Sequence, residues 1–202
     1  SGSKDPYALR RAANGIIKIV QKFGLHFDIH TDLTQIYEQV GYAKGDMQAI
    51  QSFFLERLES TLKVNPSIFS AVIAGLNSES KSQRDIVRIR QNALCLIQVL
   101  EQDSDKATLL STFKRVANIC KQSGISNVKN IHITPSLFTS AHEQVLYDEI
   151  CKIKQRFADL HNATDFVQDS VIVEFIQALF GLEQSLSQFF DNVLVNDKDA
   201  TI

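Results

Sequence analysis

The sequence is poor in residues that break helices, since its 202 residues include only eight glycines and three prolines. Because glycine and proline punctuate turns, so few of them indicate long helices rather than many short strands. The chain also lacks any apolar run near the roughly 20 residues that a membrane-spanning helix needs, and no secretory signal opens it. We therefore expect a soluble, all-α protein: a helical bundle of about seven to nine helices in antiparallel hairpins, with no substantial sheet.

Cysteine is scarce too, and its spacing excludes two classes of site. Cys95, Cys120 and Cys151 stand far apart in the sequence, each beside apolar neighbours in a helix-like pattern. Structural zinc sites use closely spaced cysteine pairs or clusters with histidine, and secreted disulfide frameworks use even numbers of cysteines. We expect three reduced thiols in the core of a cytoplasmic protein.

The patterns that mark enzyme sites are missing as well. The sequence has no glycine-rich phosphate loop, and the His-Glu pair at 142–143 lacks the second histidine of a zinc-protease helix. His26 and His30 lie four residues apart with Asp28 and Asp32 nearby, but in a predicted loop. A satisfied or exposed histidine is the more common reading of such a pair. We predict no catalytic residue, no metal site and no bound cofactor in this chain.

Charge is unevenly distributed along the sequence. Residues 84–121 carry seven Lys or Arg against four Asp or Glu, a net charge of 7 − 4 = +3, whereas residues 122–202 carry five against eleven, a net charge of 5 − 11 = −6. Each phosphate that a protein neutralises needs a cation, so a chain with net charge −2 is a poor candidate for wrapping DNA. Any contact with nucleic acid should be local and should involve the basic middle third.

Capping signals place several helix ends. Asp5-Pro6 and Asn65-Pro66 combine an acceptor cap with proline at the first helical position, Asp46 is a further cap, and residues 140–143 form a Ser-x-x-Glu capping box. Gly24 is suited to end the first helix, whose apolar residues predict that it is buried. The predicted helices span residues 6–23, 32–43, 46–63, 66–76, 83–102, 104–122, 141–160 and 165–195, the last bending near Gly181, with loops at 25–30, 77–83 and 123–135.

The predicted helix at 104–122 separates an apolar face from a polar one. At about 100° per residue, the apolar face holds Leu109, Phe113, Val116 and Cys120. The opposite face holds Lys114, Asn118 and Lys121, with Arg115 on its flank. Lysine and arginine bind phosphate, and asparagine can read a base edge. The face therefore suits nucleic acid, although basic residues on a helix are more often simply solvated.

The preceding helix adds further cations. Arg84 and Arg88 recur on one face of the predicted helix at 83–102, with Arg90 beside them. The short connection near Asp103 predicts that this helix and the next form an antiparallel hairpin. If their polar faces converge, the arginines lie near the basic face of the 104–122 helix.

Four segments resemble, in order, the C-terminal region of the bacterial glycyl-tRNA synthetase beta subunit. They are DPYALRRAANGI at 5–16, FFLERL at 53–58, FKRVANI at 113–119 and FFDNVLV at 189–195. One departure is the LEQS at 182–185, where this family commonly has Leu-Arg-Glu-Pro, so no arginine role carries over to that place.

The resemblance implies a piece of a class II ligase. In that family the alpha part, whether a separate subunit or fused to beta, joins glycine to AMP with ATP and Mg and then to tRNA. The beta part binds tRNA, and its C-terminus is a helical anticodon-binding domain. The implied organisation is a short leader at 1–4 outside the domain, junction helices at 5–80 and an anticodon-binding domain at 81–202, with tRNA(Gly), the alpha part and the remaining beta domains as partners.

The residues that we expect to bind the anticodon loop are Lys114, Arg115, Asn118 and Lys121, followed by Arg84, Arg88 and Arg90. The lysines should hold phosphates, and Arg115 or Asn118 should carry any base preference. Two alternatives stay open. Arg115 can instead pair with an acidic residue of the last third, and the whole region can instead serve as a helical docking module for assembly of the alpha and beta parts.

Overall fold

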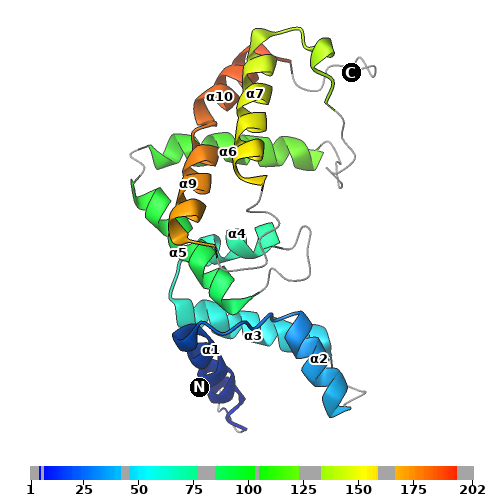
Figure 1. Cartoon of the computed structure of the whole chain (residues 1–202), viewed down its shortest axis with the longest axis vertical. Helices are drawn as coiled ribbons and strands as arrows, with labels where there is room; N and C mark the ends of the chain where they lie inside the picture. Colours follow the sequence, from blue (N-terminus) through cyan, green and yellow to red (C-terminus); the bar gives the residue numbers. More distant parts are fainter. Residues whose placement is uncertain are drawn as a thin grey trace. The chain divides into compact units, whose positions relative to one another are not determined.

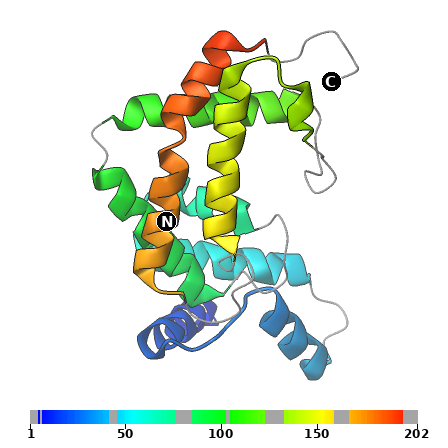
Figure 2. The ribbon, with the colours of Figure 1, turned by 45° about the horizontal axis from the view of Figure 1, so that its top comes forward.

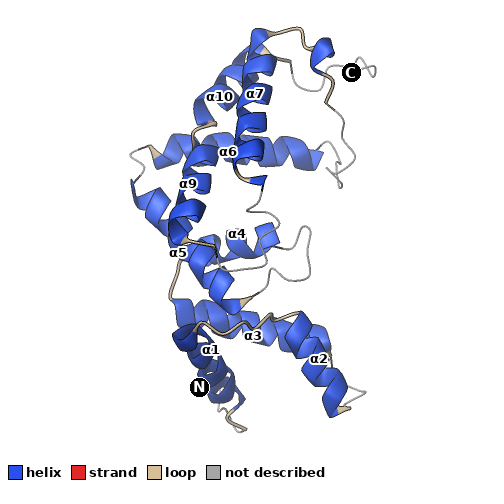
Figure 3. Cartoon of the chain, in the orientation of Figure 1, coloured by secondary structure: helices blue, strands red, loops and turns tan. Residues whose placement is uncertain are grey.

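The structure is a computed structural model that describes residues 5, 7–41, 46–76, 85–102, 105–122, 133–158 and 167–194. These residues are helices joined by loops (Figures 1 and 3). The extended pairing found within them is an isolated antiparallel bridge between Asp28 and Asp85. The predicted all-α class is confirmed. None of the helices in the described ranges is long and apolar enough to cross a membrane.

The chain divides into two compact units, residues 1–98 and 99–202. The functional division predicted from the sequence, 5–80 against 81–202, stays a prediction. So does the hairpin of the helices at 83–102 and 104–122, because that hairpin would join the two units.

The first unit contains α1 (Leu9–Phe23), α2 (Thr31–Val40), α3 (Met47–Leu62), α4 (Pro66–Leu76) and the first part of α5 (Ile86–Gln102). Several predicted ends are confirmed. Gly24 ends α1 in the left-handed region at φ 61°, and Asp46 caps α3 by accepting a hydrogen bond from the Ala49 N–H at 3.2 Å. The loop predicted at 77–83 lies outside the described residues.

The start of the first helix was predicted wrongly. Helix α1 begins at Leu9, after Ala8 at φ 55°, and not at Pro6. Asp5 does act as an acceptor, but its carboxylate takes the more distant N–H groups of Arg10 and Arg11, at 3.3 and 3.4 Å. The cap therefore reaches over an extra turn of chain before the helix begins.

The core of the first unit is built from all five helices. Its fully buried members include Ile17 of α1, Leu58 of α3 and Ile86 and Ile89 of α5, each with no exposed surface, and Ile29 joins them from the loop before α2. Only one side of α1 is buried, so the prediction of a buried helix was wrong. Leu9, Ile16, Ile19 and Phe23 remain between 40% and 65% exposed.

A carboxylate fastens the loop after α1 to the start of α5. Asp85, which is 8% exposed, caps α5 by accepting hydrogen bonds from the N–H groups of Val87 and Arg88 at 2.9 and 3.0 Å. Its other oxygen accepts from the Phe27 N–H at 2.7 Å and from the His26 ring at 2.9 Å. Helix α5 therefore begins after Asp85, three residues later than predicted.

The other polar residues of this loop are also satisfied within the protein. Buried Asp28 accepts from the N–H groups of His30 and Thr31, and Asp32 accepts from the Asp28 N–H. The His30 ring accepts from the Gln51 amide at 3.0 Å. Each histidine has a hydrogen-bond partner and the His26 side chain is largely exposed, which agrees with the expected satisfied or exposed histidines. Among the described residues, no group of three or more His, Cys, Asp or Glu is placed to hold a metal ion.

The second unit contains α6 (Lys106–Gln122), a 3₁₀ turn (Pro135–Leu137), α7 (Ala141–Arg156), α9 (Asp169–Phe180) and α10 (Glu183–Asn192). The capping box of α7 is present as predicted, with the Glu143 carboxylate accepting from the Ser140 N–H. The predicted bend near Gly181 separates α9 from α10. Most of the loop predicted at 123–135 lies outside the described residues.

The helices of this unit lie along two directions: α7, α9 and α10 along one, and α6 across them (Figure 2). Helix α7 runs antiparallel to the α9–α10 pair (Figure 2). Leu146, Leu182 and Leu186 form the buried centre, and the partly buried residues packed against it are Phe113, Val116, Ile153, Leu179 and Phe189. The packing of α6 on α10 decides which of its side chains face solvent.

The cysteine prediction was wrong in one part. None of the three cysteines is in a disulfide and Cys95 is buried, but Cys120 is exposed and Cys151 is only partly buried. Cys120 follows the apolar periodicity of α6, but it lies one turn beyond Val116, the last residue of α6 that packs on this core. Apolar periodicity predicts which side of a helix faces the core, but it does not predict how far along the helix the core extends.

Candidate nucleic-acid interface

Helix α6 keeps its basic and amide side chains in solvent. Lys114, Asn118 and Lys121 are all exposed, as their spacing predicts. The opposite side packs: Leu109 is 4% exposed, and Phe113 is partly buried against the core. Figure 1 shows α6 as a continuous helix through this region, so the three polar side chains share one rigid support.

Arg115 lies at the seam between α6 and α10. Its guanidinium carbon is 4.4 Å from the centroid of the Phe190 ring, and Nη2 donates to the Phe190 carbonyl oxygen at 3.5 Å. In the described residues its partners are thus a ring and a carbonyl rather than the carboxylate that the sequence left open. The side chain remains exposed despite these contacts.

A partly buried polar network joins α6 to α10. The Thr112 hydroxyl donates to the Glu183 carboxylate at 3.0 Å, and the Ser187 hydroxyl donates to the same oxygen at 2.9 Å. Thr112 is only 8% exposed. A satisfied polar network of this kind favours one arrangement of the helices over others. Sequence reasoning missed it, because a threonine next to an apolar face gives no sign of its partner.

The three predicted arginines of the preceding helix are placed differently. Arg84 lies outside the described residues. Arg90 is exposed on α5, and Arg88 is partly buried in the first turn, where Asp85 caps its N–H. These residues belong to the first unit. Their convergence with the basic face of α6 stays a prediction.

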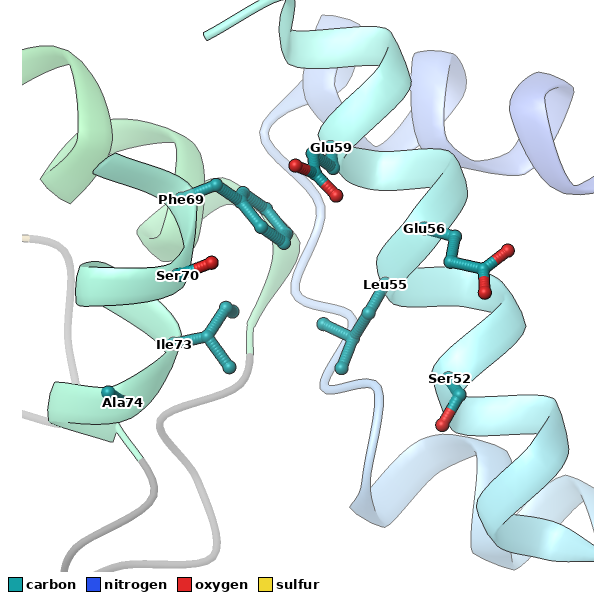
Figure 4. Close-up of a pocket in the computed structure, with 8 residues that line it drawn as sticks. All are labelled: Ser52, Leu55, Glu56, Glu59, Phe69, Ser70, Ile73 and Ala74. Carbon is teal, nitrogen blue, oxygen red and sulfur yellow. The ribbon is translucent and has the colours of Figure 1, made fainter. Parts of the chain in front are cut away.

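The first unit also contains an open pocket of about 360 Å³ between α3 and α4. Figure 4 shows Leu55, Phe69 and Ile73 extending into the space between the two helices, with Glu56 and Glu59 on α3. The residues that line this pocket include no lysine or arginine, so it offers no cation to a phosphate.

Sequence comparison finds similarity between this chain and glycyl-tRNA synthetase beta subunits. Residues 1–74 match the family model described as the glycyl-tRNA synthetase beta subunit. A glycine–tRNA ligase beta subunit from Helicobacter pylori (strain G27) is 36% identical over all of this chain. The corresponding proteins of Thermodesulfovibrio yellowstonii and Listeria welshimeri are each 30% identical, over 100% and 96% of the chain.

The chain spans 27% of the length of these relatives, so it corresponds to a part of each. The similarity nevertheless covers every described helix, from α1 through α6 to α10. Along its whole length, this chain is therefore similar to part of the glycine–tRNA ligase beta subunits, and its residues 1–74 also match the family model.

Proposed function

We propose that this chain is the C-terminal, tRNA-binding part of a glycyl-tRNA synthetase and that it recognises the anticodon loop of tRNA(Gly). The observation that carries the proposal is the exposed face of α6, where Lys114, Asn118 and Lys121 stand together on one rigid helix. Its relatives are named as glycine–tRNA ligase beta subunits, which supports tRNA as the nucleic acid.

In the proposed complex, charged side chains bind phosphates and an amide side chain forms hydrogen bonds with a base. Lys114 and Lys121 hold phosphates of the loop, and Asn118 lies between them to contact a base edge. Proteins read RNA sequence mainly in unpaired loops, where base edges are accessible. Glycine anticodons share two cytosines, whose carbonyl and ring nitrogen accept hydrogen bonds from amide or guanidinium donors.

The ligation chemistry belongs to another part of the enzyme under this proposal. The alpha part uses ATP with Mg to activate glycine, while this chain needs no cofactor of its own. Its partners are tRNA(Gly), the alpha part and the remaining beta domains, and its place of work is the cytoplasm. Neither DNA nor a membrane has a role.

Replacing Lys114 or Lys121 with alanine should weaken binding of a glycine-anticodon stem-loop about three- to tenfold at low salt. Each substitution removes about one phosphate contact, so the slope of log affinity against log salt should fall by about 0.7. The measurement is a fluorescence-anisotropy titration at several salt concentrations. Lys18→Ala, which removes an exposed lysine of α1, is the matched control and should change neither quantity.

Asn118→Ala tests the base contact separately. It should leave the salt slope unchanged and reduce the preference for the cytosine-containing loop over a loop with both cytosines replaced. Unchanged affinity and unchanged discrimination in both lysine variants and in Asn118→Ala would exclude this face of α6 as the interface.

A second function, docking, is favoured by the exposed side of α1. Leu9, Ile16, Ile19 and Phe23 fall within one arc of the helix and are 59%, 40%, 53% and 65% exposed. We call these four residues the α1 stripe. A contiguous exposed apolar stripe is typical of an interaction surface. Its proposed occupant is the remainder of the beta chain, because α1 lies in the family match and the relatives are almost four times longer than this chain.

Hydrogen exchange of the α1 amides tests the docking function. These amides should exchange at least tenfold more slowly in the full-length enzyme than in this chain alone, because a covered helix frays less often. A full-length Ile19→Ser/Phe23→Ser variant should lose that extra protection. Equal exchange of α1 in the chain and in the full-length enzyme would contradict docking through the α1 stripe.

A further inference from the structure

Three side chains at the α6–α10 seam contact one another in a row that begins at the core and ends in solvent. Phe189 packs against the buried core, and its ring centroid is 5.5 Å from that of Phe190 in an edge-to-face arrangement. The Arg115 guanidinium lies over Phe190 on the other side of the seam. Arg115, the outermost of the three side chains, is exposed, so residues packed on the core support an arginine that faces the solvent.

Arg115 is restrained by two different contacts. The Phe190 ring attracts the cation, and the Phe190 carbonyl oxygen accepts a hydrogen bond from Nη2. The Thr112–Glu183 hydrogen bond lies one turn earlier on α6 and fixes the helix against α10. An arginine held in this way loses less conformational freedom on binding than one that is free in solvent.

Arg115 lies at a different angle around α6 from the two lysines that are proposed to bind phosphate. At about 100° per residue, Lys114, Asn118 and Lys121 fall within about 60° of one another, and Asn118 is the member nearest to Arg115. Arg115 lies on the α10 side, about 60° from Asn118 and about 100° or more from the two lysines. Its guanidinium lies over a ring, so it presents a planar group to the solvent, unlike the point charge of a lysine.

We propose that Arg115 is a stacking platform for one unpaired nucleobase, with its guanidinium between the base and the Phe190 ring. This inference rests on the proposed RNA binding and adds the kind of contact that Arg115 makes. A guanidinium is planar and stacks on aromatic faces, and unpaired RNA bases stack on arginine planes. Asn118, one helical turn away, then lies on the side from which it contacts the edge of the same base.

Arg115→Lys is the decisive substitution because it keeps the charge and removes the planar group. The probe is a glycine-anticodon stem-loop RNA in which a fluorescent cytosine analogue replaces one loop cytosine at a time. The unaltered chain should change the fluorescence of one of these positions on binding, as stacking does. Arg115→Lys should abolish that change and weaken binding about tenfold, the effect of losing one stacked base.

Phe190→Leu tests the support beneath the arginine. It should reproduce the loss of the fluorescence change, because leucine keeps an apolar contact but gives the guanidinium no ring. Phe180→Leu is the matched control, since Phe180 pairs with Phe113 elsewhere in the same unit. That control should bind as the unaltered chain does, and circular dichroism of both variants should show the same helix content.

The outcomes separate the platform from the wider function. If Arg115→Lys binds with unchanged affinity and fluorescence, Arg115 contacts phosphate or nothing, and the platform is wrong although RNA binding stands. If Phe180→Leu loses as much as Phe190→Leu, the effect is general packing, and the platform is again wrong. If the unaltered chain binds no stem-loop, the proposed function fails first and the platform fails with it.

Discussion

Replacing Asp85 with alanine is expected to lower the free energy of unfolding of the first unit by about 3 kcal/mol. The carboxylate accepts four hydrogen bonds, three from backbone N–H groups and one from the His26 ring. Its removal uncaps α5 and leaves the Phe27 N–H without its acceptor next to the core. The measurement is urea denaturation followed by circular dichroism, comparing midpoints at equal slope.

Asp85→Asn is the control for this substitution. Asparagine keeps one good acceptor for the helix cap but weakens the bonds that a carboxylate makes, so about half of the loss should remain. If Asp85→Ala unfolded at the same urea concentration as the unaltered chain, the α1–α2 loop and the start of α5 would not be joined as described.

Ile17→Ala is expected to lower the free energy of unfolding by about 3 kcal/mol. Ile17 has no exposed surface and packs in the core of the first unit. Truncation removes buried methyl groups and leaves a cavity that the neighbouring core residues fill only in part. Thermal unfolding monitored by circular dichroism reports the loss as a fall in Tm.

The matched control for Ile17 is Ile19→Ala, on the same helix with the same change in helix propensity. Ile19 is 53% exposed, so its truncation should change the free energy of unfolding by less than about 0.5 kcal/mol. Equal losses from the two substitutions would mean that both sides of α1 are buried in this chain. That result would contradict the α1 stripe and remove the basis for docking through it.

The features of the fold that the sequence predicted are local ones. The Asp46 cap, the Gly24 stop and the capping box of α7 each depend on residues within one turn of a helix end. Such signals depend only on residues close together in the sequence, so they can be recognised without knowing the tertiary structure. The Asp85 cap of α5 is equally local and was overlooked, whereas its bond with the distant Phe27 N–H has no local signal.

The candidate site likewise has one feature that the sequence predicts and one that it does not. The exposure of Lys114, Asn118 and Lys121 follows from the period of α6, which the sequence contains. The contact of Arg115 with Phe190 joins residues 75 apart in the sequence. A single sequence carries no record of that pairing, and so it could suggest an acidic partner for Arg115 but not the aromatic one.

The central claim is that this chain reads the glycine anticodon, and the direct measurement is its binding to two stem-loops. One carries the glycine anticodon and the other has both shared cytosines replaced, and each is titrated at low and moderate salt. The account predicts binding that weakens steeply with salt and is at least tenfold weaker for the replaced loop. Equal binding of both loops, or binding of neither by this chain when the full-length enzyme binds its tRNA, would contradict it.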